Sequence, residues 1–226
     1  MERFNSSLSL NDCPFGTSQR FLEIPEELIG LSREEKIPII RSTAPSSISI
    51  AKITDYLERR LAPRMTIHGV LLEVFGLGVL LLGPSGIGKS ECALELVLKG
   101  HRLVADDYVE LTRRGIDKLS GMGGKVLKHH MELRGLGIIN IKELFGISAT
   151  GTSQNVDFAV RLERWKPDAE YDRLGVDQSA IEFLGISIPV IDMPVAPGRN
   201  VATLVEVAAR IQLLRQRGYQ SSSEVH

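Results

Sequence analysis

The sequence predicts an α/β fold built around a phosphate-binding loop. Residues 79–82 form a continuous apolar run, which is typical of a strand buried on both faces. Directly after it, Gly83, Gly88, Lys89 and Ser90 fit the pattern G-x-x-x-x-G-K-[ST]. Apolar residues then recur at helical spacing between residues 92 and 97. Strand, glycine-rich loop and helix therefore follow in the order that such a loop requires.

The loop itself predicts a set of nucleotide-binding residues. In this pattern backbone N–H groups point at phosphates, the lysine reaches phosphate oxygens and the hydroxyl reaches magnesium. The helix N-terminus that follows also favours an anion. An ordinary glycine-rich turn is the alternative interpretation. The expected binding residues are Gly83, Pro84, Ser85, Gly86, Ile87, Gly88, Lys89 and Ser90.

The segments before the loop are assigned from periodicity and capping residues. Apolar residues at spacings of three and four, with a serine at the start, predict an amphipathic helix over residues 46–61. Two apolar runs on either side of Gly76 predict an antiparallel pair of strands at residues 66–75 and 77–82. Further upstream we expect a helical segment near residues 25–31 and a strand at 37–40.

The segments after the loop alternate between strand and helix patterns. Gly100 ends the helix predicted at residues 88–99. Residues 186–190 and 191–195 predict another strand near a sheet edge, because Pro189 and Pro194 lack N–H donors. The other expected elements are strands at 101–104, 108–112 and 156–162 and a long amphipathic helix at 200–216.

Length and composition favour a single catalytic domain. We expect a shortened αβ segment at residues 1–62, the catalytic domain at 63–218 and a polar tail at 219–226. A net charge of -1 gives no field that would attract nucleic acid or an anionic membrane. No apolar run approaches the roughly 20 residues of a membrane-spanning helix. Cys13 and Cys92 are far apart, which predicts neither a disulfide framework nor a metal site and favours the reducing cytoplasm.

Two consecutive acids follow the strand that returns from the loop helix. Ligands of open α/β sheets collect at the carboxyl ends of strands, so Asp106 and Asp107 are expected beside the phosphates. One would hold magnesium and the other would accept a proton from an incoming hydroxyl. The alternative is a pair of solvated turn aspartates.

Other candidate residues have weaker local signals. Glu132 and Arg134 lie two apart on extended chain and point to the same side, which suits a magnesium ligand and a phosphate contact or an ordinary surface ion pair. His68, in an apolar strand, is typical of a hydrogen-bonded core residue. Arg173 and Arg199 are candidate phosphate clamps, although loop arginines are usually solvated.

Five segments together resemble one family, the bacterial HPr kinase/phosphorylases. They span roughly residues 46–218, and the third is far more specific than the phosphate loop. The segments are IHGVLLEVFGLGVLLLGPSGIGKSECALEL, HRLVADDYVEL, MELRGLGIINIKELFG, YDRLG and PVAPGRN followed by a helix.

The resemblance implies a fold, an activity and roles for individual residues. The fold is a phosphate-loop kinase akin to phosphoenolpyruvate carboxykinase, with a mixed sheet and flanking helices. The activity is transfer of the ATP γ-phosphoryl to a serine of the phosphocarrier HPr, with reverse phosphorolysis by inorganic phosphate that releases pyrophosphate. ATP and Mg²⁺ are the implied cofactors, with pyrophosphate as a possible donor, and a homohexamer is the implied assembly. His68, Lys89, Asp107 and Arg173 match catalytic positions, with Asp107 as the base, and Ser90 and Glu132 match magnesium ligands.

Two departures leave alternatives open. The family's N-terminal domain is roughly twice as long as the segment before residue 62, and Ala196 stands where the family often has a basic or polar residue. That loop belongs to the dephosphorylating half-reaction. A phosphate-loop kinase of another protein or of a small molecule therefore remains an alternative, as does a module that senses nucleotide without turnover.

Overall fold

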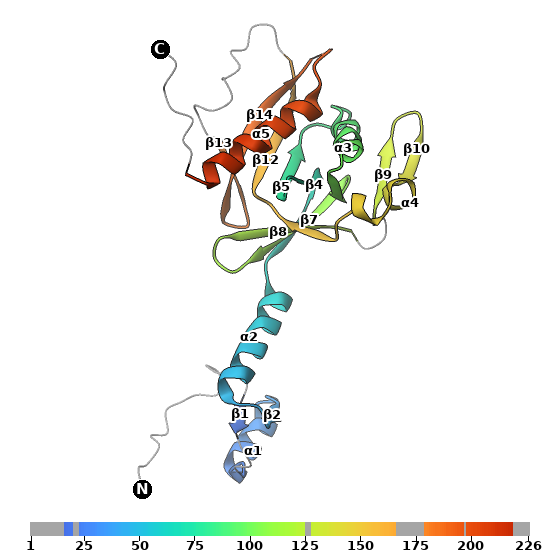
Figure 1. The fold of residues 1–226 in the computed structure, drawn as a ribbon. Helices are drawn as coiled ribbons and strands as arrows, with labels where there is room; N and C mark the ends of the chain where they lie inside the picture. Colours follow the sequence, from blue (N-terminus) through green and yellow to red (C-terminus); the bar gives the residue numbers. More distant parts are fainter. Residues whose placement is uncertain (1–15, 20–22, 125–127, 166–178, 197, 219–226) are drawn as a thin grey trace. The chain divides into compact units, whose positions relative to one another are not determined.

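The chain divides into two compact units, residues 1–61 and 62–226. The computed structural model describes residues 16–19, 23–124, 128–165, 179–196 and 198–218 (Figure 1). Within these residues no helix has the length and apolar character needed to cross a membrane.

The first unit is a small αβ arrangement. Strand β1 (Gly16–Gln19) pairs in parallel with β2 (Ile39–Ser42), and the helices are α1 (Glu26–Glu34) and α2 (Ser46–Leu61). The helix predicted at residues 46–61 is confirmed, whereas the strand predicted at 37–40 lies two residues further along. Where the structure describes side chains in residues 23–61, none is buried. Among the residues of this unit whose side chains the structure describes, apolar side chains are therefore at most partly buried.

The second unit contains a mixed six-stranded sheet in the order β13-β14-β12-β5-β4-β6. Strand β12 runs parallel to β5 and β14, while the β4–β5, β4–β6 and β13–β14 pairs are antiparallel. This confirms the predicted α/β class with a mixed sheet. The strands are β4 (Val70–Val74), β5 (Leu77–Leu82), β6 (Arg102–Ala105), β12 (Phe158–Arg164), β13 (Ser179–Phe183) and β14 (Ile186–Val195).

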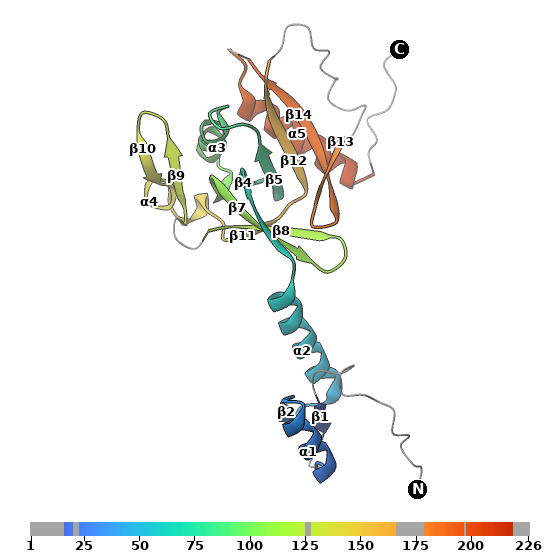
Figure 2. The ribbon, with the colours of Figure 1, turned by 180° about the vertical axis from the view of Figure 1, so that it is seen from behind.

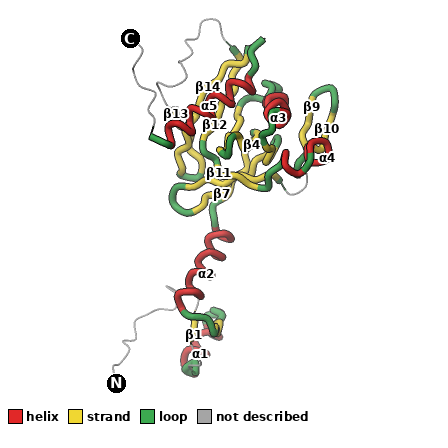
Figure 3. Tube along the Cα trace, in the orientation of Figure 1, coloured by secondary structure: helices red, strands yellow, loops and turns green. Residues whose placement is uncertain are grey.

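A second sheet and a hairpin complete the unit (Figure 3). The four-stranded sheet has the order β11-β8-β7-β3, and β9 pairs with β10 in the hairpin. These strands are β3 (Arg64–His68), β7 (Tyr108–Arg114), β8 (Lys118–Gly123), β9 (His130–Leu133), β10 (Gly137–Asn140) and β11 (Ser153–Asn155). The helices of the unit are α3 (Lys89–Leu98), α4 (Ile141–Phe145), the 3-10 turn η2 (Ile147–Ala149) and α5 (Val201–Gln216).

The six-stranded sheet is buried on both faces. Helices α3 and α5 pack on one face, where Val70 and Leu72 join a core with Leu96 and Val205 (Figure 1). The four-stranded sheet lies on the other face, which is seen from behind in Figure 2, and there Leu71 packs with the core of β7 and β8. Alternate residues of a strand point to opposite faces, so a continuous apolar run supplies both cores.

The strand predicted at residues 66–75 is wrong as a single element. The strand is interrupted at Gly69, so that β3 pairs with β7 in one sheet and β4 pairs with β5 in the other. The N–H of Gly69 donates to the carbonyl oxygen of Asp107 at 3.0 Å. Residues 64–68 alternate between polar and apolar side chains, whereas residues 70–74 are almost continuously apolar, and the prediction joined these two patterns into one strand.

The proline-containing segment 186–195 is one strand, β14, which lies second from the edge of the sheet. Strand β13 covers its outer side only along residues 186–190. Pro194 lies beyond that range and is opposite Glu163 of β12 on the inner side. Its missing N–H therefore costs no bond to β13.

Glu206 of α5 connects the two helices that cover the sheet. Its Oε2 accepts a hydrogen bond from Lys99 Nζ at 2.6 Å, and its Oε1 lies 3.0 Å from His101 Nε2. The hydrogen bond from Lys99 is the main cause that lowers the pKa of Glu206. A carboxyl whose pKa is lower in the folded chain stabilises the fold above its unfolded pKa, and that contribution is lost as pH falls through the folded pKa.

We expect Glu206→Gln to lower the free energy of unfolding at neutral pH by about 1 kcal/mol, because the amide keeps the size and loses the charge. The difference should shrink as pH falls below the ordinary glutamate pKa of 4.5. Urea unfolding of both proteins at neutral and acidic pH measures it. In a Lys99→Met background, Glu206→Gln should lower the free energy of unfolding by less. An equal cost at both pH values would contradict the interpretation.

Candidate active site

The loop between β5 and α3 is shaped by glycines. Gly83, Gly86 and Gly88 have φ angles of 142°, 75° and 105°. Residues with a side chain rarely adopt such values, so the three glycines permit the tight path of the loop. Helix α3 begins at Lys89, and the unpaired N–H groups of its first turn lie at the loop.

Lys89 is buried, and its ammonium group binds the loop itself. Nζ donates to the carbonyl oxygens of Gly83 at 2.9 Å and of Pro84 at 3.1 Å. Burial lowers the pKa of Lys89, while the nearby charges of Asp106, Asp107 and Glu91 oppose that shift. The acids thus help to keep a cation at the base of the loop.

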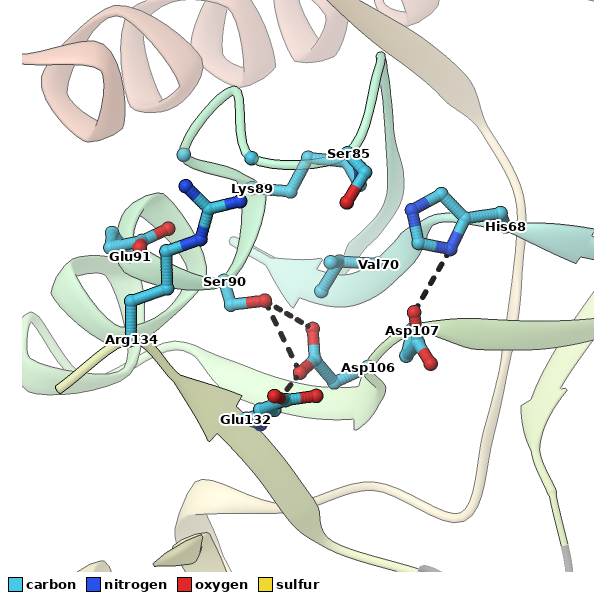
Figure 4. Close-up of a pocket in the computed structure, with 12 residues that line it drawn as sticks. His68, Val70, Ser85, Lys89, Ser90, Glu91, Asp106, Asp107, Glu132 and Arg134 are labelled. Atoms are coloured by element: carbon cyan, nitrogen blue, oxygen red, sulfur yellow. Dashed lines mark hydrogen bonds and ion pairs between the residues drawn. The ribbon is translucent and has the colours of Figure 1, made fainter. Parts of the chain in front are cut away.

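Ser90 joins the loop helix to the acids that follow β6. Its hydroxyl donates to the carboxylate of Asp106, with Oγ 3.0 Å from Oδ1 and 3.3 Å from Oδ2 (Figure 4). The backbone N–H of Glu132 donates to Oδ2 at 3.3 Å. Burial raises the pKa of Asp106, the hydrogen bonds from Ser90 and Glu132 oppose the shift, and the charge of Asp107 adds to it.

Asp107 faces the other side of the pocket. Its Oδ1 lies 2.9 Å from Nδ1 of His68, and both side chains are about half exposed, at 50% and 42%. The aromatic ring of Tyr108 meets the imidazole edge-on, with ring centroids 6.1 Å apart. His68 therefore lies in the pocket with a carboxylate partner and is not a core residue.

Arg134 reaches the loop, and its guanidinium occupies the space next to Gly86. A Cβ built on Gly86 would collide with the guanidinium nitrogens of Arg134. Arg134 follows the end of β9, and Glu132 within that strand lines the same pocket. The residues predicted two apart on extended chain are thus both placed at the site (Figure 4).

One pocket brings together most of the residues that the sequence predicts for the site. The predicted residues that line it are His68, Ser85, Gly86, Gly88, Lys89, Ser90, Asp106, Asp107, Glu132 and Arg134. Gly83 and Pro84 do not line it and contribute carbonyl oxygens that bind Lys89. Ile87 instead packs its side chain against the apolar core. Arg199 is exposed and does not line the pocket, and its N–H donates to Ala196 O at 3.2 Å. Arg173 lies outside the described residues.

Sequence reasoning left two features of the site open. The residue pattern placed Asp106 and Asp107 together without dividing their roles, because burial is not visible in a pair of identical residues, and only the family resemblance named Asp107 as the base. Sequence reasoning also passed over Glu91, which lines the pocket from the first turn of α3. The position of Glu91 directly after the loop serine was the available signal.

The oxygen atoms at the pocket suit a hard divalent cation. Ser90, Asp106 and Glu132 present a hydroxyl and two carboxylates around one point of the pocket (Figure 4). In the part of the chain that the structure describes, no three or more His, Cys, Asp or Glu side chains are grouped to hold a metal ion. Magnesium normally needs no such cage, because it binds one or two carboxylates together with phosphates and waters. The donor set therefore fits magnesium.

Known proteins resemble this chain in both sequence and fold. Residues 59–226 match the HPr Serine kinase C-terminal domain. The HPr kinase/phosphorylase of Thermoanaerobacter sp. (strain X514) is 45% identical over 207 residues, which cover 92% of this chain and 68% of that protein. The protein of the same name from Brevibacillus brevis is 44% identical over 222 residues, which cover 98% and 71%.

A solved structure of a protein with a related name is similar to this chain in fold. The Hpr(Ser) kinase/phosphatase from Coxiella burnetii is similar with a TM-score of 0.64 and 34% sequence identity, over 72% of this chain and 98% of that chain. The phosphate-loop geometry, the family match and the relatives agree. The chain belongs to the HPr kinase/phosphorylase family.

Proposed function

We propose that this chain transfers the γ-phosphoryl group of ATP to a serine of the phosphocarrier protein HPr. We also propose the reverse phosphorolysis, in which inorganic phosphate removes the group as pyrophosphate. The observation that carries the proposal is one pocket with a phosphate-binding loop on one side and the Asp107–His68 pair on the other. Membership of the family supports HPr as the acceptor.

The loop side suits the binding of a triphosphate. Lys89 and the α3 N-terminus supply positive potential, and the guanidinium of Arg134 lies next to the loop at Gly86. Ser90, Asp106 and Glu132 would hold Mg²⁺, which when bound neutralises phosphate charge. Lys89 would exchange its bonds to the Gly83 and Pro84 carbonyls for phosphate oxygens.

The opposite side suits the acceptor hydroxyl. The serine oxygen forms a bond to the γ-phosphorus while the bond from that phosphorus to the bridging oxygen of ADP breaks, and the serine proton goes to Asp107. His68, bonded to Asp107, holds the carboxylate in place. In phosphorolysis an oxygen of inorganic phosphate forms a bond to the seryl phosphorus while the bond from that phosphorus to the serine oxygen breaks, and the protonated Asp107 carboxyl gives its proton to the serine oxygen.

Further proposals rest on the family resemblance. Arg173 would contribute to catalysis, and Arg199 would contact phosphate only if its exposed side chain turned toward the pocket. We also propose a hexamer and a cytoplasmic location. None of these further proposals changes the transfer step described above.

Mass spectrometry of HPr tests the central proposal. The protein is incubated with HPr, ATP and magnesium, and the mass of HPr is measured before and after. Addition of one phosphoryl group at a serine supports the proposal. ATP consumption without a change in HPr would indicate a kinase of another acceptor, and binding of ATP without consumption would indicate a nucleotide sensor.

We expect Asp107→Asn to slow the transfer by roughly a hundredfold or more, because the amide is nearly isosteric and accepts no proton. The affinity for ATP should change much less, since Asp107 lies on the acceptor side of the pocket. Lys89→Ala is the comparison variant, for which both transfer and ATP binding should be lost. Single-turnover rates and ATP titrations measure the two effects. Equal loss of rate and affinity in Asp107→Asn would assign it a structural role.

Gly86→Ala tests the contact between Arg134 and the loop. A Cβ at Gly86 would displace the guanidinium and would also strain a residue whose φ is 75°. We expect ATP affinity to fall on the order of tenfold. Ser85→Ala, at the neighbouring loop position, changes a side chain without that collision and should affect affinity less. Similar affinities for Gly86→Ala and the native chain would show that Arg134 does not assist the loop.

A further inference from the structure

Gly69 is the single residue between two strands that belong to different sheets. Strand β3 ends with His68 opposite Tyr108, and β4 begins with Val70 opposite Leu81. A Cβ on Gly69 would lie 2.9 Å from Leu81 O and 3.3 Å from a methyl carbon of Leu82. The first distance is shorter than real Cβ contacts allow, so β5 closes the space that a side chain would need.

The N–H of Gly69 is directed at a residue of the active site. It donates to the carbonyl oxygen of Asp107 at 3.0 Å. Asp107 has a φ of 68°, and the N–H of Tyr108 donates to Asp106 O at 2.9 Å. A hydrogen bond across three residues with a positive φ at the centre defines the rarer, strained form of γ-turn. The surroundings must hold such a conformation in place.

The turn explains how two consecutive aspartates reach one pocket. Consecutive side chains of a regular strand point to opposite faces. Here Asp106 points to Ser90 and Asp107 points to His68, and both line the pocket (Figure 4). The backbone reversal at Asp107 therefore brings the second carboxylate to the side where the first one lies.

We propose that Gly69 is a positioning residue for Asp107. Its N–H fixes the carbonyl of the strained turn, and its missing side chain lets β5 approach closely enough to keep that N–H in place. Gly69 touches no substrate and acts through the direction of the Asp107 carboxylate. The effect on turnover rests on the proposed function, whereas the strain at Asp107 does not.

The first experiment compares melting temperatures of Asp107→Gly and Asp107→Ala and needs no activity. At a strand position with ordinary φ, a glycine variant is less stable than the alanine variant, but at a position with positive φ the glycine variant is the more stable of the two. We expect Asp107→Gly to melt above Asp107→Ala. Glu110 on β7, the strand that follows Asp107, is not among the residues with positive φ and is the control. There the glycine variant should melt below the alanine variant. Asp107→Gly melting at or below Asp107→Ala would overturn the strained turn and with it the proposal.

The second experiment measures phosphoryl transfer by Gly69→Ala. We expect kcat to fall roughly tenfold to a hundredfold, the scale of a small misplacement of a catalytic group, with the KM for ATP nearly unchanged. Gly124→Ala is the matched control, because a Cβ there meets nothing within 4 Å. It should keep native kcat and KM.

The substitutions are then combined in a double-mutant cycle. If Gly69 acts through Asp107, Gly69→Ala should cost little further rate in the Asp107→Asn background. The same loss in both backgrounds, or native activity of Gly69→Ala, would overturn the positioning role. If Gly69→Ala unfolds at too low a temperature for its activity to be measured, the order of the melting temperatures of Asp107→Gly and Asp107→Ala still tests the strained turn. If no chain phosphorylates HPr, the proposed function fails while the melting order stands.

Discussion

The pairing of β4 with a strand on each side is the constraint on which the active site depends. Because β5 and β6 are both antiparallel to β4, they run in the same direction and their carboxyl ends emerge at one edge of the sheet. The phosphate loop follows β5 and Asp106 follows β6, so the backbone ladder alone brings lysine, hydroxyl and carboxylate together. The chain enters β4 at that same edge, which places His68 there as well. A register shift between Leu71 and Leu72 next to the site is typical of strands that redirect side chains.

The charges of the pocket determine which form of a nucleotide binds there. Four carboxylates line it, those of Glu91, Asp106, Asp107 and Glu132, against the cations Lys89 and Arg134 and the imidazole of His68. A polyphosphate without a counter-ion would meet more negative than positive charge, and like charges at short range repel strongly in a partly buried site. We therefore expect the loop to prefer the magnesium complex of the nucleotide. The buried lysine favours phosphate, and the acids select for a cation that arrives with it.

Local signals in the sequence were enough for the elements whose ends are fixed by their own residues. Helices α2 and α5 follow from their apolar spacing and the loop from its glycines. The structure adds that the side chain of Asn200, which accepts from Thr203 N at 2.8 Å, caps the start of α5. The break at Gly69 was not visible, because Leu81 O, which excludes a side chain there, comes from a different strand. Arg134 was a candidate from its spacing to Glu132, but its place next to Gly86 depends on the β9–β10 hairpin. Positions fixed by contacts between distant segments carry no periodic signal.

Two identical side chains next to each other in the chain take different tasks because the fold surrounds them differently. Asp106 is half-buried and accepts hydrogen bonds from Ser90 and from the backbone of Glu132, so its oxygens are fixed in direction and its pKa is raised chiefly by desolvation. Asp107 is half exposed and meets His68, on the side that an acceptor from solvent can reach. A carboxylate of fixed direction beside a hydroxyl is suited to bind a metal ion that requires a defined coordination geometry. A solvent-accessible carboxylate is suited to accept the proton of the substrate hydroxyl. The environment, and not the residue type, therefore divides the roles, as in other enzymes whose paired carboxylates differ in burial.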